Sequence, residues 1–329
     1  MTRDHAEIYA PEFGRRHLSN HFPMVSFALK KLGADQSTLE DLNRNNLQSL
    51  KLNADNHDSL VISESNFEQY LGKRQAYMGY HAYFRGKIIT GKELPRIDDL
   101  AKGISAAAFH ALIRAGYGID ANDASEVAAG LAYMADKFLS VVPEKNKHSI
   151  VSGINLHDFA QDLIAKRTAG ELEPLPSDQT ISGKMDITAQ DRVRQELIST
   201  AYNVANLSLG QVADISLEVF LRTNDFTALH AVTASHAARL VLPFVGDKDA
   251  FVRELFAGIV TAVLTIPGKQ FRRDAFNPKE PLSPEALSHR GRVSTDSHDI
   301  KFVYSCLEEF KSYGDIRYLA AAELRLDGW

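Results

Sequence analysis

The chain has 329 residues, 44% of them hydrophobic, which is enough for a substantial core in one large domain or two smaller ones. Its 42 acidic and 37 basic residues leave a formal charge of -5, so the composition provides no general attraction to phosphate backbones or anionic lipid. We therefore expect no nucleic-acid partner. The single cysteine, Cys306, cannot form an internal disulfide, and its helical context predicts a small buried hydrophobic residue.

The first residues, Met1 to Glu7, contain early acidic side chains and no continuous apolar run, unlike a secretory signal. No later segment has the roughly 18 uncharged apolar residues that a membrane span requires. We therefore expect no membrane span, and with one cysteine a cytoplasmic location fits best.

Apolar residues recur at helical spacing along most of the chain. The period of three to four residues is clearest in four segments, residues 24–32, 39–50, 127–138 and 217–221. Strand-like patterns are limited to two short candidates, residues 59–62 and 87–90, which are too little to build a sheet-based domain. We see no seam between domains, so the pattern predicts a single all-α domain over residues 1–329.

Two stretches predict long loops within this domain. Residues 168–184 are rich in Gly, Pro, Ser and acidic side chains, and residues 268–291 are rich in Pro and Arg. Loops of this length in a compact helical domain often cover a site or are simply mobile.

Four of the twelve histidines, His21, His110, His230 and His298, stand in helix-like segments with the most distinctive local sequences. Neutral imidazole is the commonest protein metal ligand, so buried histidines from four helices would indicate a site. Asn20 is a plausible N-cap before His21. A lone histidine at a helix start is nevertheless more often a hydrogen-bonded structural group than a ligand.

His110 lies in the apolar run 104–113, whose composition predicts a buried helix. An imidazole there needs a buried partner, which could be merely a backbone carbonyl, or it costs about 1–3 kcal/mol. The following residues, Gly116 to Ala121, match the letters G-x-G-x-x-A of a dinucleotide site. They follow a helical pattern and no βαβ unit surrounds them, so we expect the glycines to mark a helix end.

His230 and His236 are six residues apart on one predicted helix, about 240° around its axis, so one site cannot easily use both. His298 and Lys301, in contrast, share a helix face that Asp296 or Ser297 could cap. A lysine on an inward face must snorkel, have a lowered pKa or be modified. An exposed pair on the first turn is the alternative.

Several catalytic motifs are absent from the sequence. It contains no H-E-x-x-H, no P-loop, no C-x-x-C and no G-x-S-x-G. These absences argue against zincin and α/β-hydrolase chemistry.

In four stretches the chain resembles the questin oxidase-like family, oxygenases best known from fungal anthraquinone pathways. The stretches occur in family order: Asn20-His21 running on to Ala34, Phe109 to Gly118, Leu229 to Arg239, and His298 to Lys301. The resemblance implies a helical oxygenase with a mononuclear non-haem iron held by histidines, which acts with O2 on a polycyclic aromatic or quinone-like molecule. Arg114 and Asp120 depart from the family pattern, where we would expect histidine and glutamate.

On this reading the metal ligands are His21, His110, His230 and His298, with Lys301 as an unusual fifth candidate. An amine is a poor iron ligand, so Lys301 would have to be deprotonated or carbamylated. Candidate groups for catalysis or substrate contact are Tyr117 and Arg239, with Thr233 beside them.

NADPH could serve as an external reductant, although the sequence has no motif for binding it.

Two rival readings remain: a catalytically inactive helical protein that binds a lipophilic small molecule in the same cavity, and a structural protein whose histidines are only packed. Metal content separates the oxygenase from both rivals, and a pocket separates the rivals from each other.

Overall fold

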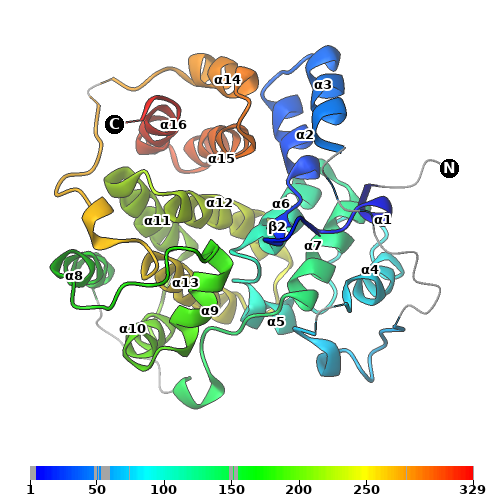
Figure 1. The fold of residues 1–329 in the computed structure, drawn as a ribbon, viewed down its shortest axis with the longest axis horizontal. Coiled ribbons are helices and arrows are strands. Elements are labelled where there is room, and N and C mark those ends of the chain that lie inside the picture. Colours follow the sequence, from blue (N-terminus) through cyan, green and yellow to red (C-terminus); the bar gives the residue numbers. More distant parts are fainter. Residues whose placement is uncertain are drawn as a thin grey trace.

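The computed structural model describes residues 5–47, 50, 52, 60–73, 75–147, 151, 155–278 and 280–328. These residues form sixteen α-helices, five short 3-10 helices and one two-stranded sheet, which confirms the predicted all-α fold (Figure 1). The sheet is a hairpin in which β1 (Glu12–Phe13) pairs with β2 (Leu18–Ser19) in antiparallel register. Cys306 is buried, as its context predicts.

The α-helices are, in chain order, α1 (His5–Ile8), α2 (Phe22–Lys31), α3 (Gln36–Leu47), α4 (Tyr77–Arg85), α5 (Ile97–Leu100), α6 (His110–Ala121), α7 (Ala124–Asp136), α8 (Leu156–Ala169), α9 (Ile181–Gln190), α10 (Arg192–Tyr202), α11 (Leu209–Thr223), α12 (Phe226–Val241), α13 (Lys248–Val263), α14 (Pro284–Val293), α15 (Ser297–Tyr313) and α16 (Arg317–Asp327). The 3-10 helices are η1 (Glu68–Tyr70), η2 (Ala101–Gly103), η3 (Glu144–Asn146), η4 (Leu242–Phe244) and η5 (Gly268–Gln270).

Helix α12 is the central element of the core. It packs against α6, α11, α13 and α15, and Figure 1 shows it between α11 and α6 in the middle of the molecule. Every residue from Thr227 to Ala238 is buried, as expected of a helix covered on all sides. The first two turns of α12 contact the beginnings of α6 and α15, through His230 and Phe226.

Gly116 and Gly118 lie inside α6, so the prediction that they end the helix was wrong. The helix continues to Ala121 and ends at Asn122, whose backbone is left-handed with φ of 53°. A Cβ on Gly116 would lie 2.9 Å from both Cα and Cβ of Ala237 in α12. These glycines therefore serve close helix packing.

The strand candidates were also wrong. Residues 60–62 and 87–90 form no strand, and Ser59 lies outside the described residues. A strand-like pattern of three or four residues stays irregular when no neighbouring strand pairs with its backbone.

The two predicted loops are shorter than expected. Helix α8 runs to Ala169 and α9 begins at Ile181, so the first irregular segment is 170–180. In the second, Ser283 caps α14 and Pro284 is its first residue, a position that tolerates proline because its N–H would have no helical partner.

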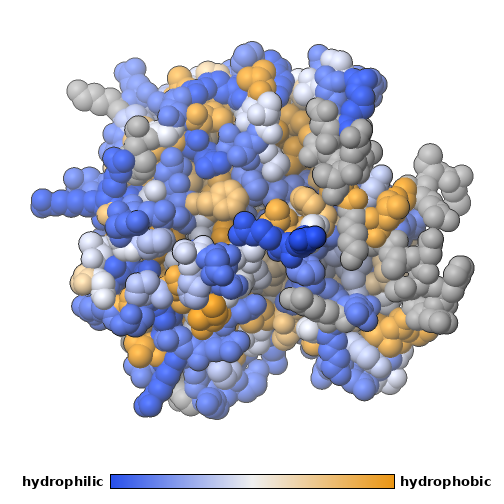
Figure 2. Space-filling view, viewed as in Figure 1, coloured by the Kyte–Doolittle hydropathy of each residue, from blue (hydrophilic) through white to orange (hydrophobic). Residues whose placement is uncertain are grey.

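In the described part of the chain, no helix combines the length and apolarity that crossing a membrane would require. Figure 2 shows hydrophilic side chains over most of one face, with small hydrophobic patches between them.

Candidate metal centre

The four histidines singled out from the sequence lie together, each at or near the beginning of a helix. His21 is the N-cap of α2, His110 is the first residue of α6, His230 lies on the second turn of α12, and His298 is the second residue of α15. The positive end of a helix dipole disfavours a charged imidazole. This arrangement therefore favours neutral rings with free electron pairs.

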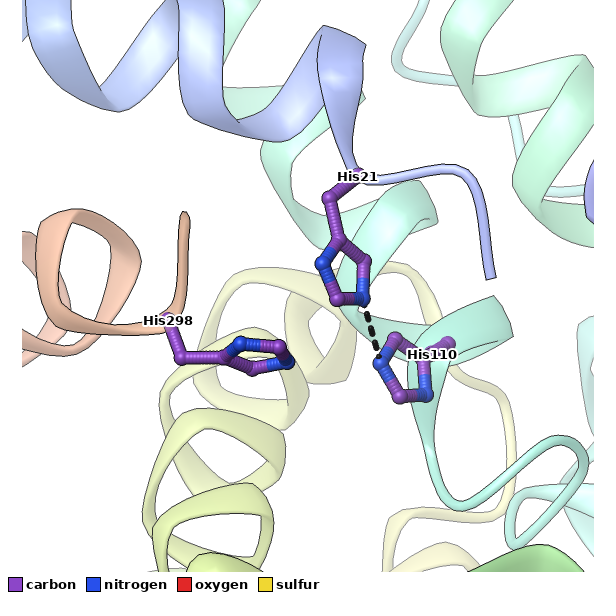
Figure 3. A group of neighbouring side chains, drawn as sticks. All are labelled: His21, His110 and His298. Atoms are coloured by element: carbon purple, nitrogen blue, oxygen red, sulfur yellow. Dashed lines mark hydrogen bonds between the residues drawn. The ribbon is translucent and has the colours of Figure 1, made fainter. Parts of the chain in front are cut away.

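The Nε2 atoms point toward one another. His110 Nε2 lies 2.8 Å from His21 Nε2 and 3.2 Å from His230 Nε2. His21, His110 and His298 each offer a ring nitrogen within 4.8 Å of the others, and Figure 3 shows these three rings directed at one space from α2, α6 and α15. The rings of His230 and His298 lie with their centroids 5.5 Å apart.

The opposite ring nitrogens, Nδ1, are all held by oxygen atoms of the protein. The pairs are His21 with Ser297 Oγ (3.1 Å), His110 with the Ala107 carbonyl (2.6 Å), His230 with the Phe226 carbonyl (2.7 Å), and His298 with Asp296 Oδ1 (3.2 Å). Metal-binding histidines characteristically use their second nitrogen in this way, because the bond fixes the tautomer and the ring orientation.

The carbonyl that holds His110 is presented by an unusual turn. The run 104–113 is not one helix as predicted: Ala107, Ala108 and Phe109 all have left-handed backbones, with φ of 50°, 53° and 67°. Such conformations cost non-glycine residues of order 1–3 kcal/mol each and persist only where the surrounding structure holds them. The alanines predicted helix by propensity, so the sequence contains no signal for this turn.

Burial is the main cause that keeps these imidazoles neutral. It holds the pKa of His21, His110 and His230 well below the usual value and lowers the pKa of His298 to about 4. The nearby charge of Lys301 lowers each of these pKa values further.

Lys301 faces inward, which was one of the two alternatives that its spacing from His298 left open, and only 3% of the residue is exposed. Burial lowers the pKa of its ammonium group to about 7, against an opposing attraction from Asp296. Asp296 also caps α15 by accepting from the backbone N–H of His298. An unprotonated Lys301 amine is therefore well populated at neutral pH.

The donor set fits a divalent metal. The Nδ1 atoms of His110 and His230 each lie next to a backbone carbonyl oxygen, which can only accept a hydrogen bond. When neutral, both rings therefore carry their proton on Nδ1 and have a lone pair on Nε2. The two Nε2 atoms are 3.2 Å apart. Two lone pairs at this distance repel, whereas a cation would attract both. Adjacent nitrogens bound to one metal at about 2.1 Å are about 3 Å apart.

A cavity of about 1070 Å³ opens onto the histidines. Its wall includes the aromatic rings of Phe13, Phe22, Phe138 and Phe226, together with charged residues of the β1–β2 hairpin. Phe226 lies against the rings of His230 and His298, at centroid distances of 4.9 and 4.4 Å, and remains 41% exposed. The sequence reasoning missed Phe226, although it stands four residues before His230 and therefore on the same helix face.

Tyr117 and Arg239 do not line this cavity. The Tyr117 hydroxyl is in the core, where it donates to the Lys301 carbonyl and lies 3.0 Å from Ser305 Oγ, and burial raises its pKa. Arg239 forms an ion pair with Glu309 at 2.8 Å. We therefore assign neither residue a part in the chemistry of the metal centre.

His236 and Thr233 also turn away from the cavity. His236 is about 240° from His230 around the helix axis, so helix geometry predicts that the two do not share a site. Its Nδ1 lies 2.7 Å from Glu309 Oε1 instead. The Thr233 hydroxyl bonds back to the carbonyls of Leu229 and His230.

Arg114 and Asp120, where we expected histidine and glutamate, both have structural partners. Arg114 is fully buried and bonds Glu126 of α7 through Nε and Nη2, at 2.7 and 3.2 Å. Asp120 accepts a hydrogen bond from Tyr304 and lies 3.7 Å from Lys31. Neither side chain lines the cavity.

The model of the questin oxidase-like family matches residues 18–306, so the chain belongs to this family. No curated protein matches the chain. Family membership indicates an oxidoreductase of the oxidase or oxygenase kind. The matched region contains all four histidines, Lys301 and the wall of the cavity from Leu18 onward.

Proposed function

We propose that the chain is an oxygenase that depends on mononuclear non-haem iron and oxidises a polycyclic aromatic or quinone-like molecule. The observation that carries the proposal is a group of ring nitrogens from histidines whose Nδ1 atoms are bound to protein oxygens. His21, His110 and His298 offer nitrogens within 4.8 Å of one another, and His230 joins them through its 3.2 Å contact with His110. His21, His110, His230 and His298 would hold the metal, and bound iron would supply the activation of O2.

The protein's own contribution is to position the ligands and the substrate. The Ala107 and Phe226 carbonyls and the Asp296 carboxylate hold three rings with their Nε2 lone pairs toward the centre. A volume of about 1070 Å³ lies at the upper end of ligand pockets, which span roughly 300–1,000 Å³. This size supports a polycyclic ligand, whose faces would pack against Phe13, Phe138 and Phe226.

Lys301 is proposed as a carbamylated ligand. Its unprotonated amine would attack CO2, forming an N–C bond and releasing one proton, and the product carries one negative charge and two oxygen donors. That anion would balance part of the charge of a divalent metal held by neutral imidazoles. NADPH is proposed only as an external electron donor, because no nucleotide-binding motif is present in the sequence.

Elemental analysis of purified protein, together with two variants, tests the metal centre. His110→Ala and His230→Ala should lose most of the bound iron, whereas His289→Ala, at an exposed position on α14, should keep it. Equal iron in all three variants would refute the shared site. Iron-free wild-type protein that still binds lipophilic aromatic compounds would instead support the inactive binding protein.

Lys301 is tested separately. Lys301→Glu should retain more metal than Lys301→Met, because only glutamate restores oxygen donors. Equal metal content in these two variants would exclude Lys301 as a ligand while leaving the histidine site intact.

A further inference from the structure

The Nδ1 partner of His21 differs chemically from the other three. The carbonyl oxygens of Ala107 and Phe226 and the carboxylate of Asp296 only accept hydrogen bonds, so they fix their histidines with the proton on Nδ1. The partner of His21 is the hydroxyl of Ser297, which can donate or accept. His21 is therefore the one ligand among the four whose tautomer its partner leaves free.

The bond between His21 and His110 selects one of these two tautomers. His110 carries its proton on Nδ1, so its Nε2 must accept in the 2.8 Å contact with His21 Nε2. The His21 proton consequently lies on Nε2, and its Nδ1 accepts from the Ser297 hydroxyl at 3.1 Å. In this arrangement a proton covers the His21 nitrogen that faces the centre.

We propose that Ser297 is a positioning residue that reverses its hydrogen bond when a divalent metal binds. One proton leaves His21 Nε2 to water and one is taken up from water at Nδ1, so the net charge of the ring is unchanged. Ser297 then accepts from Nδ1–H, and its own hydroxyl keeps its hydrogen but no longer donates it to His21. The inference rests on the proposed metal centre.

The freed hydroxyl can donate a hydrogen bond into the cavity, because Ser297 lines it. The second imidazole within reach, His298 Nδ1 at 3.4 Å, is already a donor to Asp296 and cannot accept it. Metal binding therefore creates a hydrogen-bond donor at the cavity wall. An oxygen atom of a bound substrate, such as a quinone carbonyl or a phenolate, is the chemical group that this donor suits.

Imidazole nitrogen NMR measures the tautomers directly. Protein labelled with ¹⁵N-histidine is treated with chelator and then titrated with Zn²⁺, a diamagnetic probe, and the His21 signals are assigned by their loss in His21→Ala. We expect His21 to be protonated on Nε2 before zinc is added and on Nδ1 afterwards. His21 protonated on Nδ1 in the chelated protein would overturn the inference.

Two substitutions at Ser297 separate this role from simple packing. Ser297→Asp offers an acceptor only, so it should place the His21 proton on Nδ1 even without metal, and an acidic residue is favourable at a helix start. Ser297→Ala should lower zinc affinity about tenfold, as removal of a partner of a metal-binding histidine commonly does. Ser182→Ala removes another hydroxyl of the cavity wall and should leave affinity unchanged.

The outcomes distinguish the inference from the proposed function. Wild-type protein that binds no zinc overturns the metal centre, whatever its tautomers. Zinc bound with His21 still protonated on Nε2, unchanged affinity in Ser297→Ala, or an Nε2 proton in Ser297→Asp overturns the role of Ser297 alone.

Discussion

Replacing Lys301 by Met should change how the stability of the protein depends on pH. The pKa of Lys301 is about 7 in the folded chain, against an ordinary value of 10.5. The unfolded chain therefore binds more protons than the folded chain between these values. It follows that Lys301 destabilises the fold at and below neutral pH, and that this penalty disappears as pH rises toward the unfolded pKa.

The size of the effect follows from the two pKa values. Uptake of nearly one proton on unfolding raises the free energy of unfolding by about 1.4 kcal/mol per pH unit, less near pH 7 where the folded amine is partly protonated. Between pH 7 and pH 9 the wild type should gain about 2 kcal/mol relative to Lys301→Met. Groups far from Lys301 titrate alike in both proteins and cancel in this difference.

Urea unfolding of both proteins at several pH values measures this difference. Chelator-treated samples kept free of CO2 ensure that the amine is neither coordinated nor carbamylated. Lys311→Met, where the side chain is 66% exposed, is the matched control and should follow the wild-type curve. Parallel stability curves for wild type and Lys301→Met would refute the reasoning, since they would mean that Lys301 titrates alike in both states.

Three further changes test the packing and the site. Gly116→Ala should lower stability by about 1–3 kcal/mol in thermal unfolding, because its Cβ would meet Ala237 at 2.9 Å, and an unchanged midpoint would contradict the close packing. Glu126→Gln should cost about 3–5 kcal/mol in urea unfolding by leaving Arg114 buried without its counter-charge, and a smaller loss in the double variant with Arg114→Met would confirm that cause. Asp296→Ala should cost about 1 kcal/mol as a lost helix cap and reduce metal affinity about tenfold in a chelator competition, whereas a loss of stability alone would restrict it to capping.

The helices could be predicted from the sequence because their signals are local, whereas the grouping of the four histidines was implied by the resemblance to the family. Apolar residues at helical spacing define a helix within one segment, and His298 and Lys301 share a face by spacing alone. The role of Gly116 could not be predicted in this way, because the residue that leaves no room for a side chain there is Ala237 on another helix. When the packing partner is not known, a pair of glycines in a sequence indicates a helix end.

The positioning groups of the site escaped prediction for the same reason. The turn at Ala107 contradicts the helix propensity of alanine, and only the tertiary structure holds it there. Ser297 stands next to His298 in the sequence, but the histidine it holds at 3.1 Å is His21, 276 positions away. Residues at that separation carry no periodic signal.

His21 and Ser297 are far apart in the sequence, so the candidate metal centre connects the two ends of the chain. Helix α2 packs on α15 and α6, so the first and last thirds of the sequence meet where the histidines do. The entropy needed to bring such distant segments together rises only slowly with the length between them, as about (3/2)RT ln n. A single ion bound there would close nearly the whole chain into a loop, in addition to the packing that already holds α2 against α15 and α6.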